Sequence, residues 1–168
     1  MRSNLIKDGV ISICIAIVLA ILINKFLIFK VEVPTGSMKP TINEGDMFLA
    51  TKIYNLDNLK RGDILVFYNK EENENMIKRL IGLPKDEISI KGKKLYINGK
   101  LIDESYVKYP DDYFGEFKVP ENKYFFLGDN RANSLDAREW KNPYIDAKDI
   151  KGKTQLRIYP FNNFGSIK

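Results

Sequence analysis

One long apolar segment stands near the start of the chain, and shorter apolar runs follow it. Residues 10–23 read VISICIAIVLAILI, and after two polar residues the apolar character resumes up to Phe29. A helix of about 20 residues is roughly 30 Å long, which is enough to cross a bilayer. The pattern therefore predicts a transmembrane helix over residues 9–29, preceded by a short polar segment, residues 1–8.

A cleavable signal peptide and a buried core helix are the alternatives to a membrane anchor. A signal peptide ends at a cleavage site of small residues, whereas the segment that follows here, NKFLIFKVEVP, is bulky and β-branched. The rest of the chain is too small to enclose so apolar a helix. We therefore favour a retained anchor. Basic residues flank both of its ends, so the positive-inside rule leaves the orientation open.

Beyond the anchor, strand signals outnumber helix signals. Apolar or alternating runs bounded by turn residues predict strands over residues 47–54, 63–68, 76–82, 123–129 and 154–160. Asn98-Gly99 lies between two apolar arms, and this dipeptide is typical of a two-residue hairpin turn in which both residues take a positive φ. We expect one mostly-β domain over residues 30–168, attached to a single membrane helix.

Composition narrows the kinds of site that the chain can build. It has no histidine, and its one cysteine, Cys14, lies in the apolar segment. Zinc, haem and iron–sulfur sites therefore lack ligands, and we expect neither a metal nor a cofactor. A carboxylate site for Mg²⁺ or Ca²⁺ stays open by composition, although no EF-hand motif is present. The net charge is +5, but the basic residues are scattered, so we expect no nucleic-acid partner.

Residues 34–42, PTGSMKPTI, place Ser37 between two prolines shortly after the apolar segment. Such a serine is either a turn residue or a nucleophile. A nucleophilic serine needs a nearby base that is neutral at the working pH, and without histidine the established substitute is lysine. The pKa of a free lysine is about 10.4, so a lysine base needs a pocket of low dielectric constant that lowers it.

Lys78 is the candidate base. In a strand over residues 76–82 its side chain shares one face with Met76 and Leu80, so its neighbours on that face are apolar. The alternative is a strand lysine whose ammonium group reaches solvent, and periodicity alone favours that alternative. As a base, Lys78 is expected to be largely neutral near neutral pH.

Residues 128–138, GDNRANSLDAR, form a polar loop after an apolar strand. One interpretation is a solvated loop with an Asp–Arg surface pair of little energetic value. The other is a loop that orients a catalytic group. In that case Ser134 hydrogen-bonds a neutral lysine, and the loop is braced by a supporting group: Asp129, Asp136 and Arg138.

The segments PTGSMKPTI, GDILVF, KRLIGLPKD and GDNRANSLDAR, in this order behind an anchor and in a chain without histidine, resemble bacterial type I signal peptidases. These are membrane-anchored serine proteases that remove signal peptides from exported proteins. The resemblance covers the anchor and the region from Val33 to Arg138. It implies a β-rich catalytic domain in which residues 87–119 are a reduced second-domain insertion, consisting of the Asn98-Gly99 hairpin and a loop. Lys85 departs from the family pattern, because glycine often follows the proline there.

Position by position, the resemblance implies that Ser37 is the nucleophile and Lys78 the general base. The Ser37 backbone N–H and the Thr35 hydroxyl match the two oxyanion donors, although many family members have serine in place of Thr35. Ser134 matches the residue that hydrogen-bonds and orients the lysine. Asp136 with Arg138 matches a supporting pair.

The resemblance also implies a topology and partners. The N-terminus would be cytoplasmic and the catalytic domain extracytoplasmic, with the bilayer and signal peptides as partners. Substrates would carry small residues, usually alanine, one and three positions before the cut. Two rivals differ in class. An inactive, membrane-tethered peptide-binding module is disfavoured because the site residues are intact. A self-cleaving Ser–Lys regulator related to the SOS repressors is disfavoured because a membrane helix replaces its DNA-binding domain.

Overall fold

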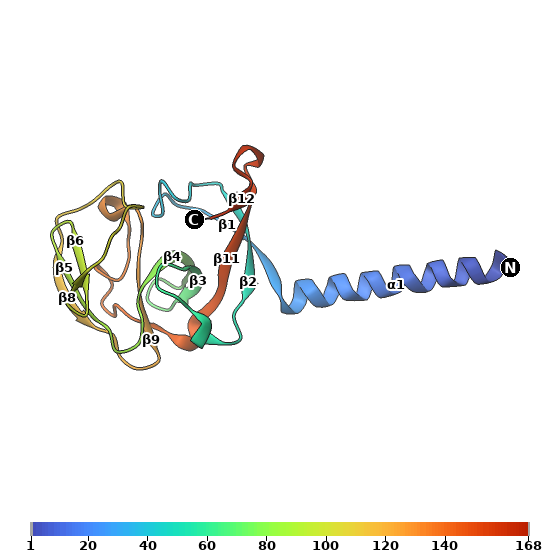
Figure 1. Ribbon diagram of the computed structural model, residues 1–168, viewed down its shortest axis with the longest axis horizontal. Helices are drawn as coiled ribbons and strands as arrows, with labels where there is room; N and C mark the ends of the chain where they lie inside the picture. The colour runs from blue at the N-terminus through green and yellow to red at the C-terminus, as the bar shows by residue number, and fades with distance from the viewer. Residues whose placement is uncertain (1, 168) are drawn as a thin grey trace.

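The first element of the structure is a long helix that stands apart from the rest of the chain. This computed structural model describes residues 2–167, with side chains from residue 9 onward. Helix α1 (Arg2–Phe26) projects away from the β-rich domain (Figure 1). Its segment Gly9–Phe26 has a mean hydropathy of 2.4, and none of it is buried. An apolar helix without protein cover fits a bilayer and not a protein core, so the buried-helix alternative is wrong.

The helix ends at the junction with the domain, three residues before the predicted end at Phe29. Strand β1 (Ile28–Glu32) follows at once and pairs antiparallel with β2 (Met47–Lys52). The Lys52 ammonium and the Tyr54 hydroxyl donate hydrogen bonds to the carbonyls of the last two helix residues. These side chains satisfy carbonyls that a helix end leaves unpaired. The apolar run at the junction is therefore divided between helix and strand.

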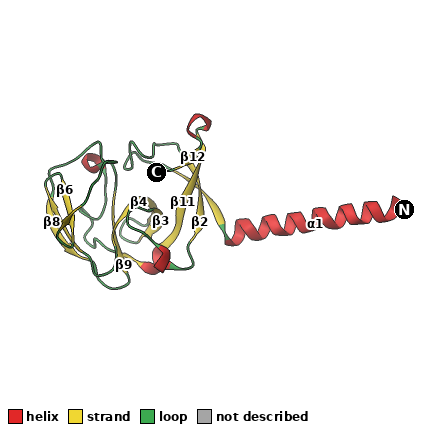
Figure 2. Cartoon of the chain, viewed as in Figure 1, coloured by secondary structure: helices red, strands yellow, loops and turns green. Residues whose placement is uncertain are grey.

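The main sheet is antiparallel and has eight strands, shown in yellow in Figure 2. Its order is β1-β2-β11-β3-β4-β9-β10, and β12 pairs with β11. The remaining strands of this sheet are β3 (Ile64–Asn69), β4 (Glu74–Gly82), β9 (Lys123–Leu127), β10 (Ile145–Asp146), β11 (Ile150–Tyr159) and β12 (Gly165–Ser166). Short 3₁₀ segments are η1 (Leu56–Asn58), η2 (Arg131–Asn133), η3 (Ala147–Asp149) and η4 (Phe161–Asn163). Each strand predicted beyond the anchor is present within a few residues of its expected bounds.

A second sheet of four strands lies within the predicted insertion, residues 87–119. Its order is β7-β6-β5-β8. The strands are β5 (Glu87–Lys91), β6 (Lys94–Ile97), β7 (Lys100–Leu101) and β8 (Phe114–Lys118). Asn98 and Gly99 join β6 to β7 with φ angles of 51° and 76°, which confirms the predicted turn. The insertion is thus a complete small sheet and not a hairpin with a loop.

Two apolar cores hold the domain together. The larger joins the two sheets and includes Phe67 and Phe126, whose rings stack with centroids 4.3 Å apart. The smaller lies beneath the loop at residues 34–42. Met38 and Ile42 from that loop are fully buried in it, together with Phe48 of β2. This loop is therefore fixed to the sheet by its own side chains, which prepares it to hold a group in one position.

Replacing Lys85 with glycine is expected to stabilise the domain. Lys85 has a φ of 73°, a left-handed conformation that is strained for a residue with a Cβ. Relief of that strain exceeds the chain entropy of glycine, so the free energy of unfolding rises by about 0.5–1 kcal/mol in thermal unfolding of the detergent-solubilised protein. Lys85→Ala also loses the exposed ion pair with Glu121 but keeps the strain. An equal stability of the two variants would contradict this explanation.

Candidate active site

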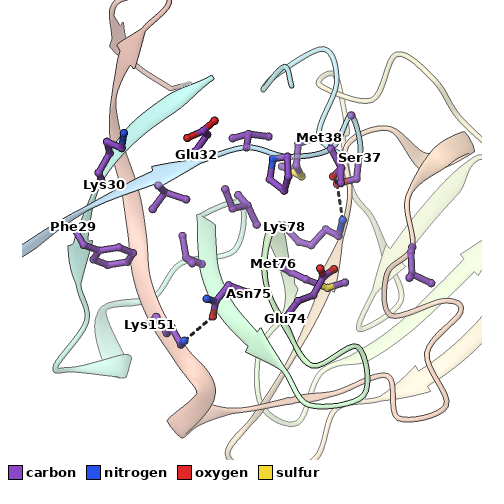
Figure 3. A pocket seen from close by; sticks show the side chains of 18 of the residues that line it. Phe29, Lys30, Glu32, Ser37, Met38, Glu74, Asn75, Met76, Lys78 and Lys151 are labelled. Atoms are coloured by element: carbon purple, nitrogen blue, oxygen red, sulfur yellow. Dashed lines mark hydrogen bonds between the residues drawn. The ribbon is translucent and has the colours of Figure 1, made fainter. Parts of the chain in front are cut away.

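Ser37 and Lys78 lie 41 residues apart in sequence and meet in the structure. Their Oγ and Nζ atoms are 2.6 Å apart, a hydrogen-bond distance (Figure 3). Both side chains are buried, with exposed fractions of 8% for Ser37 and 4% for Lys78. Lys78 is therefore not a strand lysine that reaches solvent. The structure brings together the two residues that the sequence indicated as nucleophile and base.

Lys78 reaches Ser37 because β4 lies deep in the main sheet. Residues 74–79 of β4 pair with β3, and the register places Leu65 opposite Lys78. Seven consecutive β4 residues around Lys78, from Met76 to Gly82, are buried. Other elements pack on both faces of β4 and bury it. The alternation of residues within the strand does not predict burial of both faces.

Burial lowers the pKa of the Lys78 ammonium from its ordinary value to about 8. The main cause is desolvation, which disfavours the charged form. The carboxylates of Asp136 and Glu74 act in the opposite direction, and the Arg138 guanidinium lowers the pKa further. Lys78 is thus half neutral near pH 8 and still mostly protonated at pH 7. The expectation of a largely neutral lysine at neutral pH is corrected. The two carboxylates stabilise the ammonium form of Lys78 and so limit the fall of its pKa.

Replacing Lys78 with methionine is expected to stabilise the fold. The charged lysine is less favourable in the folded than in the unfolded chain by about 3 kcal/mol, from the pKa lowered to about 8. Methionine fills similar space without charge, so the free energy of unfolding at pH 6–7 rises by about 1–3 kcal/mol. Between pH 8 and the ordinary lysine pKa, the unfolded parent binds more protons than the folded parent. The parent therefore gains stability over that range, and the advantage of methionine shrinks.

Thermal unfolding of both proteins at several pH values measures this difference. Lys118→Met is the matched control, since Lys118 is an exposed lysine on β8. Its effect should stay within about 0.5 kcal/mol at every pH. A destabilised Lys78→Met variant, or a difference that does not change with pH, would contradict the assigned cause.

Thr35 places a second hydroxyl beside the nucleophile. Its Oγ1 lies 3.2 Å from the Ser37 Oγ. Gly36, between them, has little space, because an added Cβ would approach the Lys39 side chain to 3.2 Å. The Thr35 hydroxyl therefore lies beside the Ser37 hydroxyl, and its role as an oxyanion donor stays a prediction from the resemblance.

The supporting residues form two buried ion pairs. Arg138 Nε donates to Asp136 Oδ1 at 2.8 Å, and Asp136 also accepts the Gly128 N–H at 2.9 Å. Asp129 accepts two hydrogen bonds from one edge of the Arg79 guanidinium, from Nε at 2.8 Å and from Nη2 at 2.6 Å. The loop over residues 128–138 is consequently a buried, braced element and not a solvated one. Sequence reasoning missed Arg79 as the partner of Asp129, since nothing in the pattern links them.

Ser134 does not make the expected hydrogen bond to Lys78. Its Oγ is buried and has no hydrogen-bond partner among the described residues. The side chain packs against Gly128, where an added Cβ would lie 2.1 Å from the Ser134 Oγ. The Lys78 amine is directed to Ser37 instead. Ser134 is thus close to the site, and an orienting role for it rests on the resemblance alone.

A cleft of about 650 Å³ leads to Ser37 and Lys78. Its walls are residues 29–38 and the β4 residues 74–78, with Asn133 and Leu135 beside them (Figure 3). Among the described strands, β1 pairs only with β2, and β9 pairs with β4 only from Arg79 onward. Both walls therefore present a free strand edge, to which an extended peptide can bind by main-chain hydrogen bonds. These walls were not identified from the sequence, because pairing with distant strands decides which edges stay free.

The family model described as signal peptidase, peptidase S26, matches residues 6–159, nearly the whole chain. This chain belongs to that family. It is 40% identical to signal peptidase I of Bacillus licheniformis, over 96% of this chain and 92% of the relative. It is 36% identical to signal peptidase I of Leptolyngbya laminosa, over 96% of this chain and 84% of the relative.

A solved structure agrees with the family. The crystal structure of a signal peptidase I from Enterococcus faecalis has a TM-score of 0.51 and 29% identity, covering 59% of this chain and 98% of that one. The resemblance to signal peptidases and the predicted mostly-β fold are thereby confirmed. Membership of the family makes the chain a protease, and the apolar helix α1 fits a membrane anchor.

Proposed function

We propose that the chain hydrolyses the bond between signal peptide and mature protein in exported preproteins, with Ser37 as nucleophile and Lys78 as general base. The observation that carries this proposal is the buried contact of 2.6 Å between Ser37 Oγ and Lys78 Nζ. Family membership supports the substrate class, and the lowered pKa of Lys78 supports its role as a base. No cofactor takes part in this chemistry.

Acylation begins from neutral Lys78. The Ser37 hydroxyl donates its hydrogen bond to the Lys78 amine, and Oγ attacks the carbonyl carbon of the scissile bond as the proton passes to Nζ. The carbonyl oxygen becomes an oxyanion, which the Ser37 N–H and the Thr35 hydroxyl stabilise. Collapse of this intermediate breaks the peptide bond. The departing amine of the mature protein takes the proton from Lys78, and the signal peptide stays as an ester on Ser37.

Deacylation uses the same base again. Lys78, neutral once more, takes a proton from a water molecule whose oxygen attacks the ester carbonyl. The ester bond breaks, and the proton returns from Lys78 to the Ser37 oxygen. The signal peptide leaves with a new carboxylic acid group, which releases its proton to water. Asp136, Arg138 and Asp129 keep the loop beside Lys78 in place during both steps.

The cleft explains a preference for small residues at alternate positions. A peptide that binds as an added strand turns every second side chain toward the protein. Side chains one and three positions before the cut then point the same way, into the cleft that Met38 and Ile77 help to line. Shallow apolar contacts at these two positions favour alanine over bulky residues.

The anchor places enzyme and substrate in the same membrane. In the proposed topology the N-terminus is cytoplasmic, residues 9–29 contain the span, and the domain lies outside the cell membrane. Signal peptides are themselves held in the bilayer, so anchoring raises their effective concentration at the cleft. The lipid bilayer is thus a partner of the chain, and nucleic acid is not.

Incubating the detergent-solubilised protein with a preprotein that has alanine one and three positions before the cut tests this function. We expect cleavage after the second alanine and at least a 100-fold slower reaction when that alanine is replaced by phenylalanine. N-terminal sequencing of the mature product locates the cut. Equal cleavage of both preproteins would contradict the proposed specificity. Binding of the preprotein without any cleavage would favour the inactive peptide-binding module.

A further inference from the structure

Asn130 holds two consecutive carbonyl groups of the loop that carries Ser37. Its backbone N–H donates to the carbonyl oxygen of Ser37 at 3.0 Å, and its side-chain Nδ2 donates to the carbonyl oxygen of Gly36 at 3.1 Å. Asn130 is buried, with 9% of its surface exposed. Water therefore competes weakly for these two hydrogen bonds.

The side-chain hydrogen bond acts on the peptide unit that contains the oxyanion donor. The Gly36 carbonyl and the Ser37 N–H belong to one peptide group, which is planar, and in the trans form its C=O and N–H point in opposite directions. A donor that fixes the direction of the Gly36 oxygen therefore also fixes the direction of the Ser37 N–H. Asn130 does not line the cleft itself, so its side chain reaches the reaction only through this peptide.

We propose that Asn130 is a positioning residue that aims the Ser37 N–H at the developing oxyanion by holding the Gly36 carbonyl. The inference rests on the proposed function, because an oxyanion forms only when Ser37 attacks a carbonyl. A donor aimed at this charge acts mainly in the transition state and little in the bound substrate. Loss of the Asn130 amide should therefore lower kcat and leave KM nearly unchanged.

The size of the effect follows from a second donor at the same carbonyl. The Lys39 N–H also donates to the Gly36 oxygen, at 3.1 Å. Without the Asn130 amide, the peptide keeps this one partner and gains freedom to rotate. Loss of a whole oxyanion donor lowers kcat by about 10²- to 10³-fold. Here the Ser37 N–H is still present but is less well oriented, which should lower kcat by about 10- to 100-fold.

The test compares Asn130→Ala with the parent protein at the pH where kcat no longer changes. Alanine keeps the backbone N–H that binds Ser37 and removes only the side-chain donor. Asn130→Asp is the second variant, because it keeps the side-chain size and presents an oxygen to the Gly36 carbonyl. Asn163→Ala and Asn163→Asp are matched controls, since Asn163 is exposed in η4, far along the chain from the site.

A peptide aldehyde ending in alanine gives a readout that a merely structural role would not move. Ser37 Oγ adds to the aldehyde carbon, and the serine proton passes to Lys78. The oxygen of the aldehyde then occupies the oxyanion position. A peptide of the same sequence ending in a carboxamide binds without that bond. The aldehyde therefore reports on the oxyanion donors, and the carboxamide reports on the cleft.

We expect Asn130→Ala to lower kcat by about 10- to 100-fold, with KM and carboxamide affinity within about twofold of the parent. Aldehyde affinity should fall by a factor similar to that for kcat. Unchanged kcat, or equal losses of aldehyde and carboxamide affinity, would overturn the inference. If the alanine variant does not fold, kcat, KM and the two peptide affinities of Asn130→Asp are compared with those of the parent, and the same results support or overturn the inference. A parent protein that neither cleaves preprotein nor binds the aldehyde would overturn the proposed function and this inference together.

Discussion

Replacing Lys78 with arginine should abolish preprotein cleavage, lowering kcat/KM by about 10³-fold or more. A guanidinium group stays protonated at every working pH, so it has no lone pair to take the Ser37 proton. The positive charge is kept, and any purely electrostatic role of the lysine would survive this change. Cleavage of a preprotein, followed by the appearance of the mature fragment, measures the loss.

Lys118→Arg is the matched control, because Lys118 is exposed on β8 and pairs with Glu87. Its kcat/KM should equal that of the parent. A larger side chain at position 78 also disturbs packing, so Lys78→Met is measured beside it and should show a similar loss in a folded, more stable protein. Activity of either position-78 variant within tenfold of the parent would mean that another group takes the proton.

Replacing Ser37 with alanine should lower kcat/KM by about 10⁴-fold or more. The change removes only the Oγ that would form the ester, and the loop keeps its buried anchors Met38 and Ile42. The variant should therefore bind the preprotein with an affinity close to that of the parent. Fluorescence titration with a labelled signal peptide separates binding from cleavage.

Ser105→Ala provides the control for this substitution, since Ser105 is an exposed serine outside the cleft. It should cleave as fast as the parent. Residual cleavage by Ser37→Ala above about 1% of the parent rate, at the same bond, would assign the nucleophile to a different residue. Loss of both binding and cleavage would instead indicate that the loop had lost its structure.

The strands could be predicted from the sequence where turn residues bound an apolar run. Residues 64–69 and 123–127 are of this kind. The second run lies in the larger core, and the first contributes to both cores. Strands β5 and β8 were missed because each has only five residues and only two apolar side chains, EISIK and FGEFK. Their buried sides are recognisable only once the two sheets pack together.

The chemistry at the site could be inferred from local motifs, but its electrostatics could not. Ser37 and Lys78 each stand in a motif whose order along the chain is informative. The depth of Lys78, the carboxylates near it and the free edges of β1 and β4 depend on elements far apart in sequence. For the same reason, nothing in the loop over residues 128–138 indicated that Asn130 reaches Gly36.

The dependence of kcat/KM on pH tests the central claim most directly, because only neutral Lys78 can act as the base. In the folded protein burial lowers its pKa to about 8, so cleavage should rise with pH and reach half of its plateau near pH 8. The profile of kcat/KM reports the free enzyme, and the structure is that of the free enzyme. A rise centred near the ordinary lysine pKa of about 10.4, or a rate that does not change between pH 6 and 10, would contradict a buried lysine base.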